Sequence, residues 1–131
     1  MAKAKAKAKA KAKAKPKLER EAVATMEELI DALAEARDEV RRTEQSLRRT
    51  LRQIDQGDSV ATAVISSDPA SLRESYDSAL EAVADARHRL RSLVFALAVD
   101  EGLSIGDLGR AWGVSRQLAS RYVKEVPGTR S

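Results

Sequence analysis

Cationic side chains cluster at both ends of this 131-residue chain. Residues 1–17 alternate lysine with alanine and contain no acid, which gives this segment a formal charge of +8. Residues 102–131 add four arginines and one lysine against two acids, whereas residues 18–101 carry 11 arginines and 18 acids. Ammonium and guanidinium groups attract phosphates, so this distribution favours a polyanionic partner at the two ends and a different role for the acidic middle.

Side chains that commonly carry catalysis or bind metals are scarce. The chain has no cysteine, which excludes disulfides and thiolate metal sites. The single histidine, His88, stands between two arginines, and we expect it to be a solvated helix residue. There is no phosphate-binding glycine loop and no nucleophile beside a base. We therefore predict a protein that is not an enzyme and uses no cofactor and no metal.

The sequence gives no sign of a membrane segment. No apolar run reaches 18 residues, and no apolar stretch follows the basic start as in a secretory signal. We therefore expect no membrane partner and a cytoplasmic location.

The acidic middle has the repeating pattern of two long helices. From Ala22 to Ile54, small and apolar residues recur at alternating steps of four and three, and a similar seam runs from Leu72 to Leu97. Residues 57–68 between the seams are rich in Gly, Ser, Thr and Asp, which predicts a loop. We therefore expect an all-α fold in which residues 18–101 form an antiparallel, coiled-coil-like helical hairpin. The first predicted seam is Ala22, Met26, Leu29, Leu33, Ala36, Val40, Thr43, Leu47, Thr50 and Ile54.

Two helices alone leave part of their apolar surface open. Pairing of two hairpins into a four-helix bundle would cover this surface, which predicts a homodimer formed through the hairpin. The alternative is a monomer in which the C-terminal segment caps the hairpin.

The C-terminal segment, 102–126, has the signals of two short helices joined by a tight turn. Ser104 suits the cap of a helix running to about Trp112, and Gly113 suits a turn residue with positive φ. Ser115 suits the cap of a second helix running to about Val126, before a disordered end at 127–131. The residues expected to face inward are Leu108, Trp112, Val114, Leu118 or Ala119, and Tyr122, with Leu103 and Ile105 beneath them.

This spacing resembles the bacterial helix-turn-helix DNA-binding motif over Ile105 to Val126. The family has a small residue in the first helix, a glycine four positions later and a buried residue six positions after that. Here these residues are Gly109, Gly113 and Ala119. The segment "GVSRQ" is also similar to the start of recognition helices in many bacterial regulators and in the promoter-binding region of sigma factors. Gly109 departs from the usual alanine, and Ala119 is smaller than the usual valine or isoleucine.

The resemblance implies that the second helix enters the DNA major groove with its N-terminal part toward the bases. Arginine can read guanine, and glutamine can read adenine, through paired hydrogen bonds. The implied base-reading residues are Ser115, Arg116, Gln117, Ser120 and Arg121. Arg110 and Lys124 are expected to contact the phosphate backbone.

The lysine–alanine tail, residues 1–17, has a period of two and cannot form an amphipathic helix. Mutual repulsion of its charges predicts a disordered arm that binds phosphates without reading sequence. Its composition resembles the lysine- and alanine-rich tails of linker histones and of some actinobacterial nucleoid proteins. The expected phosphate-binding lysines are Lys3, Lys5, Lys7, Lys9, Lys11, Lys13, Lys15 and Lys17.

Together these patterns predict a bacterial protein that binds double-stranded DNA, either a transcription regulator or a nucleoid-associated protein located on the nucleoid. The alternative is an interaction adaptor whose helical hairpin binds RNA polymerase or another regulator. In that case the C-terminal helices would form a docking surface for protein.

Overall fold

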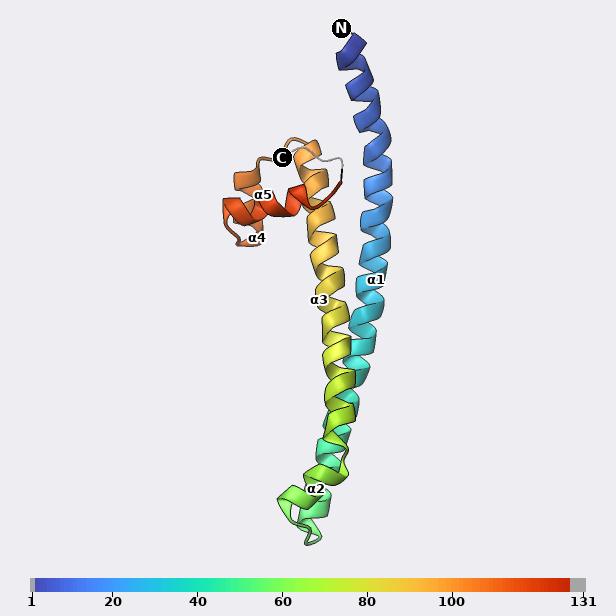
Figure 1. Cartoon of the computed structure of the whole chain (residues 1–131), viewed down its shortest axis with the longest axis vertical. Helices are drawn as coiled ribbons and strands as arrows, with labels where there is room; N and C mark the ends of the chain where they lie inside the picture. The colour runs from blue at the N-terminus through green and yellow to red at the C-terminus, as the bar shows by residue number, and fades with distance from the viewer. Residues whose placement is uncertain (1, 128–131) are drawn as a thin grey trace. The chain divides into compact units, whose positions relative to one another are not determined.

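All regular secondary structure in the part of the chain that the structure describes is helical. The computed structural model describes the backbone of residues 2–127 and the side chains of residues 16–127. In chain order, the helices are α1 (Ala2–Asp55), α2 (Val60–Ser66), α3 (Pro69–Asp100), α4 (Ile105–Trp112) and α5 (Arg116–Lys124) (Figure 1). None of these helices has a stretch long and apolar enough to cross a membrane. The predicted all-α fold is therefore confirmed for these residues.

Contacts divide the chain into two compact units. The first combines Met1–Glu28 with Ala86–Ser131, and the second is Leu29–Asp85. The first unit thus contains the beginning of α1, the end of α3, and all of α4 and α5. The second unit contains the remaining parts of α1 and α3, joined through α2.

The N-terminal segment differs from its prediction. Helix α1 begins at Ala2, so its backbone is helical through residues 2–17, where the sequence predicted a disordered arm. Alanine has the highest helix propensity and lysine is close behind, and this preference does not depend on an apolar face. The lysine side chains from Lys3 to Lys15 lie outside the described residues, as does the end of the chain at 128–131.

The predicted loop at 57–68 contains the short helix α2. Its N-cap is Ser59, whose hydroxyl oxygen accepts a hydrogen bond from the backbone N–H of Thr62 at 3.1 Å. Ala63 is fully buried, which gives this helix one anchoring contact. The loop prediction was therefore wrong over Val60–Ser66, because capping and burial outweigh the low helix propensity of its β-branched residues.

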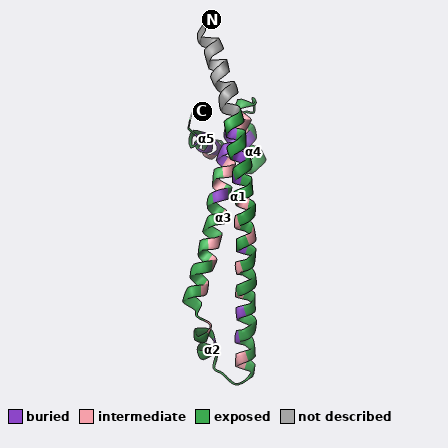
Figure 2. Ribbon diagram, turned by 90° about the vertical axis from the view of Figure 1, so that its right-hand side faces the viewer, coloured by how far each residue is buried: buried purple, intermediate pink, exposed green. Residues whose placement is uncertain are grey.

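In the second unit, α1 buries a different stripe from the one predicted. Every second residue of the predicted seam lies on the less exposed side of the helix, as predicted; among these, Ala36 and Thr50 are buried. At three of the four alternate positions the less exposed residue is one step earlier in the chain, so that Ser46 is buried and Leu47 is exposed. At the fourth, Ile54 is half-buried, as predicted. The less exposed stripe is Leu29, Ala32, Ala36, Glu39, Thr43, Ser46, Thr50, Gln53 and Ile54. Figure 2 shows the many exposed positions along this helix.

Hydrogen bonds within α1 accommodate the polar members of this stripe. The hydroxyl of Thr43 donates to the carbonyl of Glu39 at 2.9 Å, and the hydroxyl of Thr50 donates to the carbonyl of Ser46 at 3.0 Å. Small side chains of this kind permit a neighbouring helix to approach closely. On α3 the predicted seam agrees with the structure, since Leu72, Tyr76, Ala79 and Val83 are all half-buried.

The first unit has two apolar clusters that share α3. One cluster joins Leu18 and Ala22 of α1 to Leu93 and Ala96 of α3, together with Val126 beyond α5. The other surrounds Phe95, which is completely buried among residues of α4 and α5. The members of the second cluster are Phe95, Leu108, Ala119, Tyr122 and Val123. Neighbouring residues of α3 therefore face both α1 and the two short helices.

Candidate functional site

Helices α4 and α5 begin and turn where the sequence predicted. The hydroxyl oxygen of Ser104 accepts from the N–H of Asp107 at 3.1 Å, and that of Ser115 accepts from the N–H of Leu118 at 3.1 Å. Gly113 ends α4 with φ 70° and ψ 31°, the left-handed conformation that favours glycine. Helix α5 ends at Lys124, two residues before the predicted end at Val126. These predictions depended on short-range capping chemistry, and the structure confirms the caps and the turn.

The first turn of α4 carries an ion pair. Asp107 receives hydrogen bonds from the side chains of Ser104 and Arg110, and these bonds, with the nearby positive charge of Arg110, lower the pKa of the Asp107 carboxyl. Arg110 was expected to contact phosphate, but here its guanidinium is paired with Asp107. A phosphate contact by Arg110 would therefore compete with this pair.

Gly109 stands where a larger residue would not fit. A Cβ atom at this position would lie 2.8 Å from the carbonyl oxygen of Val114, closer than real Cβ contacts allow. The N–H of Val114 also donates to the carbonyl of Gly109 at 2.9 Å, so the turn folds directly back onto α4. The close turn therefore explains why glycine, rather than alanine, stands here.

One face of α5 is buried against α3 and α4. Ala119 and Val123 have no exposed surface, and the ring of Tyr122 meets that of Phe95 edge to face at 5.5 Å between centroids. The prediction was wrong for Trp112 and Leu103, which are 44% and 45% exposed. Phe95 fills the position expected for Trp112 because it projects from α3 into the centre of the cluster, while Trp112 covers its edge at 4.8 Å between centroids.

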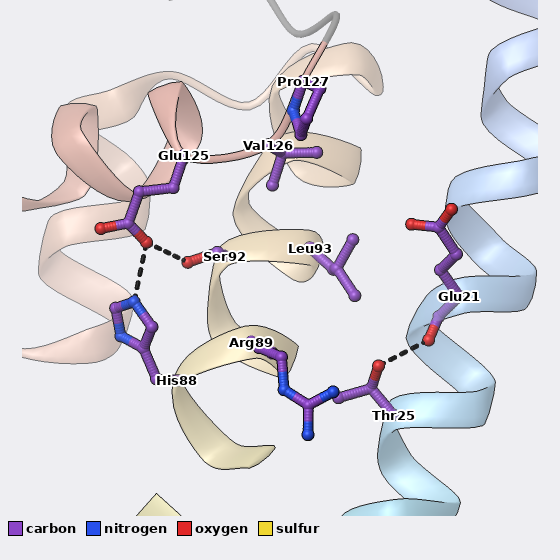
Figure 3. A pocket seen from close by; sticks show the side chains of 9 residues that line it. All are labelled: Glu21, Thr25, His88, Arg89, Ser92, Leu93, Glu125, Val126 and Pro127. Atoms are coloured by element: carbon purple, nitrogen blue, oxygen red, sulfur yellow. Dashed lines mark hydrogen bonds and ion pairs between the residues drawn. The ribbon is translucent and has the colours of Figure 1, made fainter. Parts of the chain in front are cut away.

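The end of α5 is tied to α3 by a polar cluster. A single oxygen of the Glu125 carboxylate accepts from the hydroxyl of Ser92 at 2.9 Å and from Nε2 of His88 at 2.8 Å (Figure 3). The guanidinium of Arg91 lies 2.9 Å from Nδ1 of His88 and 4.1 Å from the centre of the Tyr122 ring. Because arginine can only donate, Nδ1 is the acceptor in this contact, and Nε2 is the nitrogen that donates to Glu125. We call His88, Ser92 and Glu125 the α5 anchor.

The α5 anchor corrects the prediction that His88 is merely solvated. Its ring is half-buried and lies edge to face with Tyr122 at 5.6 Å between centroids. No local sequence signal reveals this contact, because Glu125 lies 37 positions later in the chain. The anchor fixes the end of α5, while Phe95 and Tyr122 fix its middle.

Removing the carboxylate of the anchor should loosen α5. Replacing Glu125 with alanine is expected to lower the free energy of unfolding by about 1 kcal/mol, because two hydrogen bonds of a partly exposed group are lost. Chemical unfolding and amide hydrogen exchange in α5 measure the effect. The matched control is Lys124→Ala, which is expected to stay within about 0.5 kcal/mol of the parent. Equal effects of the two substitutions would contradict the anchor.

The opposite face of α5 is polar and cationic. Arg116, Gln117, Arg121 and Lys124 are exposed, and Ser120 is half-buried. These five side chains make no hydrogen bond or ion pair with any residue that the structure describes. We call them the α5 polar face. The predicted base-reading residues Arg116, Gln117, Ser120 and Arg121 thus lie together on this face. Ser115, also exposed, directly precedes Arg116, and its hydroxyl oxygen accepts the helix-cap hydrogen bond.

The nearby acids form no ion pair with the α5 polar face. The two acids of residues 102–127 are Asp107, paired with Arg110, and Glu125, held in the α5 anchor. Among residues 16–127, no group of three or more His, Asp or Glu side chains is placed to hold a metal ion. The site is therefore a helix surface of hydrogen-bond donors and positive charge.

Comparisons with known proteins found no matching family model, no matching curated protein and no matching solved structure.

Proposed function

We propose that this chain is a bacterial DNA-binding protein that reads the major groove with α5 and grips phosphates with its lysine-rich N-terminal segment. The observation that carries the proposal is the α5 polar face, an exposed helix surface of three cations, an amide and a hydroxyl without partners within the described residues. Such side chains are the donors that base edges and phosphates accept. Helices α4 and α5, joined by a turn at Gly113, would form a helix-turn-helix.

The side chains of the α5 polar face are spaced so that all of them could enter one major groove of a DNA duplex. Arg116, Ser120 and Lys124 follow one another at steps of four, with Gln117 and Arg121 beside them. In a recognition helix the N-terminal residues reach base edges, so Arg116 and Gln117 would read bases, with Ser120 and Arg121 one turn further on. Lys124 would then meet the phosphate backbone. The N-terminal lysines would add affinity without adding sequence preference.

A DNA-binding protein that combines a base-reading helix with a lysine-rich segment could have either of two roles. A transcription regulator would act at particular loci, whereas a nucleoid-associated protein would cover the chromosome broadly. Both place the protein on the nucleoid. The balance between base contacts and phosphate contacts decides between the two roles.

Capture of sheared genomic DNA by the purified full-length protein tests the proposal. At about 150 mM salt the interaction of exposed charges is partly screened, so base reading is more visible. Enriched sites sharing a short motif would support a regulator, and broad capture without a motif would support a nucleoid protein. Absence of binding to duplex DNA at this salt concentration would contradict both roles.

A DNA motif shared by the captured sites would allow a sharper test of base reading by α5. Replacing Arg116 or Gln117 with alanine is expected to cost about 1–3 kcal/mol on the preferred site and much less on unrelated DNA. Fluorescence anisotropy with matched and scrambled duplexes measures both affinities. The control is Arg73→Ala on α3, an exposed arginine outside the α5 polar face. Equal losses on both duplexes would contradict base reading.

Exposed apolar residues of α2 favour a second candidate function. Val60 and Ile65 are 62% and 70% exposed, and such side chains are typical of surfaces that bind protein. We propose as the alternative an adaptor whose hairpin binds RNA polymerase or another regulator. Failure of DNA binding, combined with saturable binding of purified RNA polymerase, would support this alternative.

A further inference from the structure

One face of α1 in the second unit presents large apolar side chains to solvent. Ile30, Leu33, Val40, Leu47 and Leu51 are between 47% and 64% exposed. Together with Arg37 and Glu44 they follow one another at steps of 3, 4, 3, 4, 3 and 4. This is the heptad spacing with which one helix packs along another. We call Ile30, Leu33, Arg37, Val40, Glu44, Leu47 and Leu51 the α1 stripe.

The α1 stripe is distinct from the surface that α1 uses within its own unit. The less exposed positions, such as Ala36, Thr43 and Thr50, lie on a neighbouring face of the helix. Between Leu29 and Ile54, which lie at its two ends, that face carries small or polar residues, and the large apolar residues of the α1 stripe lie outside it. An exposed apolar surface of three heptads at regular spacing indicates a binding partner that is itself a helix.

The two charged members of the α1 stripe indicate which helix this partner is. Arg37 and Glu44 are opposite charges one heptad apart, near the middle of the stripe. Arg37 makes no hydrogen bond or ion pair with any described residue. Glu44 accepts from Arg48 at 2.7 Å through Oε1, which leaves its second carboxylate oxygen available. The stripe therefore carries one cation and one anion that a partner could pair.

We infer that the α1 stripe binds the α1 stripe of a second copy of this chain in the antiparallel direction, with the two-fold axis near residue 40. In this arrangement Arg37 of each copy comes within about one helical turn of Glu44 of the other, and Ile30 comes near the opposite Leu47 and Leu51. A parallel, in-register pair would instead place Arg37 against Arg37 and Glu44 against Glu44. Like charges in such positions oppose association, so charge complementarity selects the antiparallel pair of identical helices.

Sedimentation equilibrium of the full-length protein tests the association without using DNA. The expected mass is twice the 14.3 kDa of one chain at micromolar concentration. Leu47→Asp is expected to weaken the dimer at least 100-fold while circular dichroism shows the helix content unchanged, because Leu47 is exposed within its own chain. Ile65→Asp on α2 is the matched control and is expected to leave the dimer intact. A monomer at all concentrations, or equal effects of the two substitutions, would overturn the inference.

Charge exchange tests the direction of the pair. Arg37→Glu is expected to weaken the antiparallel dimer about 10-fold, because residue 37 then meets Glu44 of the other copy. The double variant Arg37→Glu/Glu44→Arg is expected to restore the parent affinity. In a parallel pair the single change would only exchange one like-charge contact for another. Weakening that the double variant does not reverse, or no weakening, would overturn the antiparallel arrangement.

Introduced thiols test the direction independently, since the chain has no cysteine of its own. In the antiparallel pair, residue 40 lies beside its counterpart, while the two copies of residue 51 lie about 30 Å apart at 1.5 Å per residue. Val40→Cys is therefore expected to form a disulfide-linked dimer under mild oxidation, and Leu51→Cys is expected to form none. Equal cross-linking of both variants would indicate a parallel pair and overturn the inference.

Discussion

Replacing all eight lysines of residues 3–17 with glutamine is expected to make the DNA affinity far less sensitive to salt concentration, because these residues then no longer neutralise phosphates. Each phosphate neutralised contributes a slope of about −0.9 in log affinity against log salt, so the loss of eight contacts removes up to about 7 from the slope. Glutamine keeps the side chain long and helix-compatible while removing the charge. Affinities measured by fluorescence anisotropy across a salt series give the two slopes.

A second variant shows whether the lysines act by contacting phosphates or only by raising the net charge of the protein. Arg41→Gln/Arg49→Gln/Arg52→Gln removes three exposed cations from α1 within the acidic second unit. We expect this variant to keep the parent slope, because the acidic hairpin should stay away from DNA. If both variants reduce the slope of log affinity against log salt in proportion to the charge removed, the lysines act through net charge alone. The proposal that they contact phosphates directly is then wrong.

Replacing Gly109 with alanine is expected to destabilise the packing of α4 against the turn by about 1–3 kcal/mol. The new methyl group would lie 2.8 Å from the backbone oxygen of Val114, and backbone cannot move aside as a flexible side chain can. Alanine is usual at this place in the helix-turn-helix motif that the sequence resembles, yet this chain should lose stability from it. Chemical unfolding followed by circular dichroism measures the change.

Two other glycines of this segment provide matched controls for Gly109. At Gly106 an added Cβ would make only ordinary contacts, with the end of the Arg110 side chain at 3.7 Å and the Ser104 hydroxyl oxygen at 3.9 Å, so Gly106→Ala is expected to gain up to about 1 kcal/mol of helix propensity. At Gly113 an added Cβ would meet nothing within 4 Å, and the cost of about 1–2 kcal/mol comes from its φ of +70° alone. A gain in stability at Gly109 like that expected at Gly106 would show that the turn relaxes freely.

The sequence predicts those parts of the structure that depend on local chemistry. Ser104, Gly113 and Ser115 are each determined by hydrogen bonds or backbone conformation within four residues, and all three behave as predicted. The polar face of α5 follows from the same local pattern, since a helix that begins at Arg116 and buries Ala119 and Val123 exposes Gln117 and Arg121 on its other side.

The features that the sequence does not predict depend on distant parts of the chain. The buried stripe of α1 could not be chosen from hydrophobicity, because small residues such as Ser46 and large ones such as Leu47 repeat at the same period. In the folded chain the small residues are the buried ones, and only the fold shows this. The contact of His88 with Glu125 likewise requires α3 and α5 to come together, as does the placement of Phe95 in the centre of the cluster.

The residues that hold α5 in place differ from the residues that we propose to bind DNA. Ser115 starts the helix, Ala119 and Val123 bury it, and Glu125 ties down its end. None of these four belongs to the polar face, which in turn makes no hydrogen bond or ion pair within the described residues. The side chains of the polar face can therefore be substituted without disturbing the fold. Such substitutions would change the preferred ligand. New binding preferences could arise on this scaffold by single substitutions without a compensating change elsewhere in the chain.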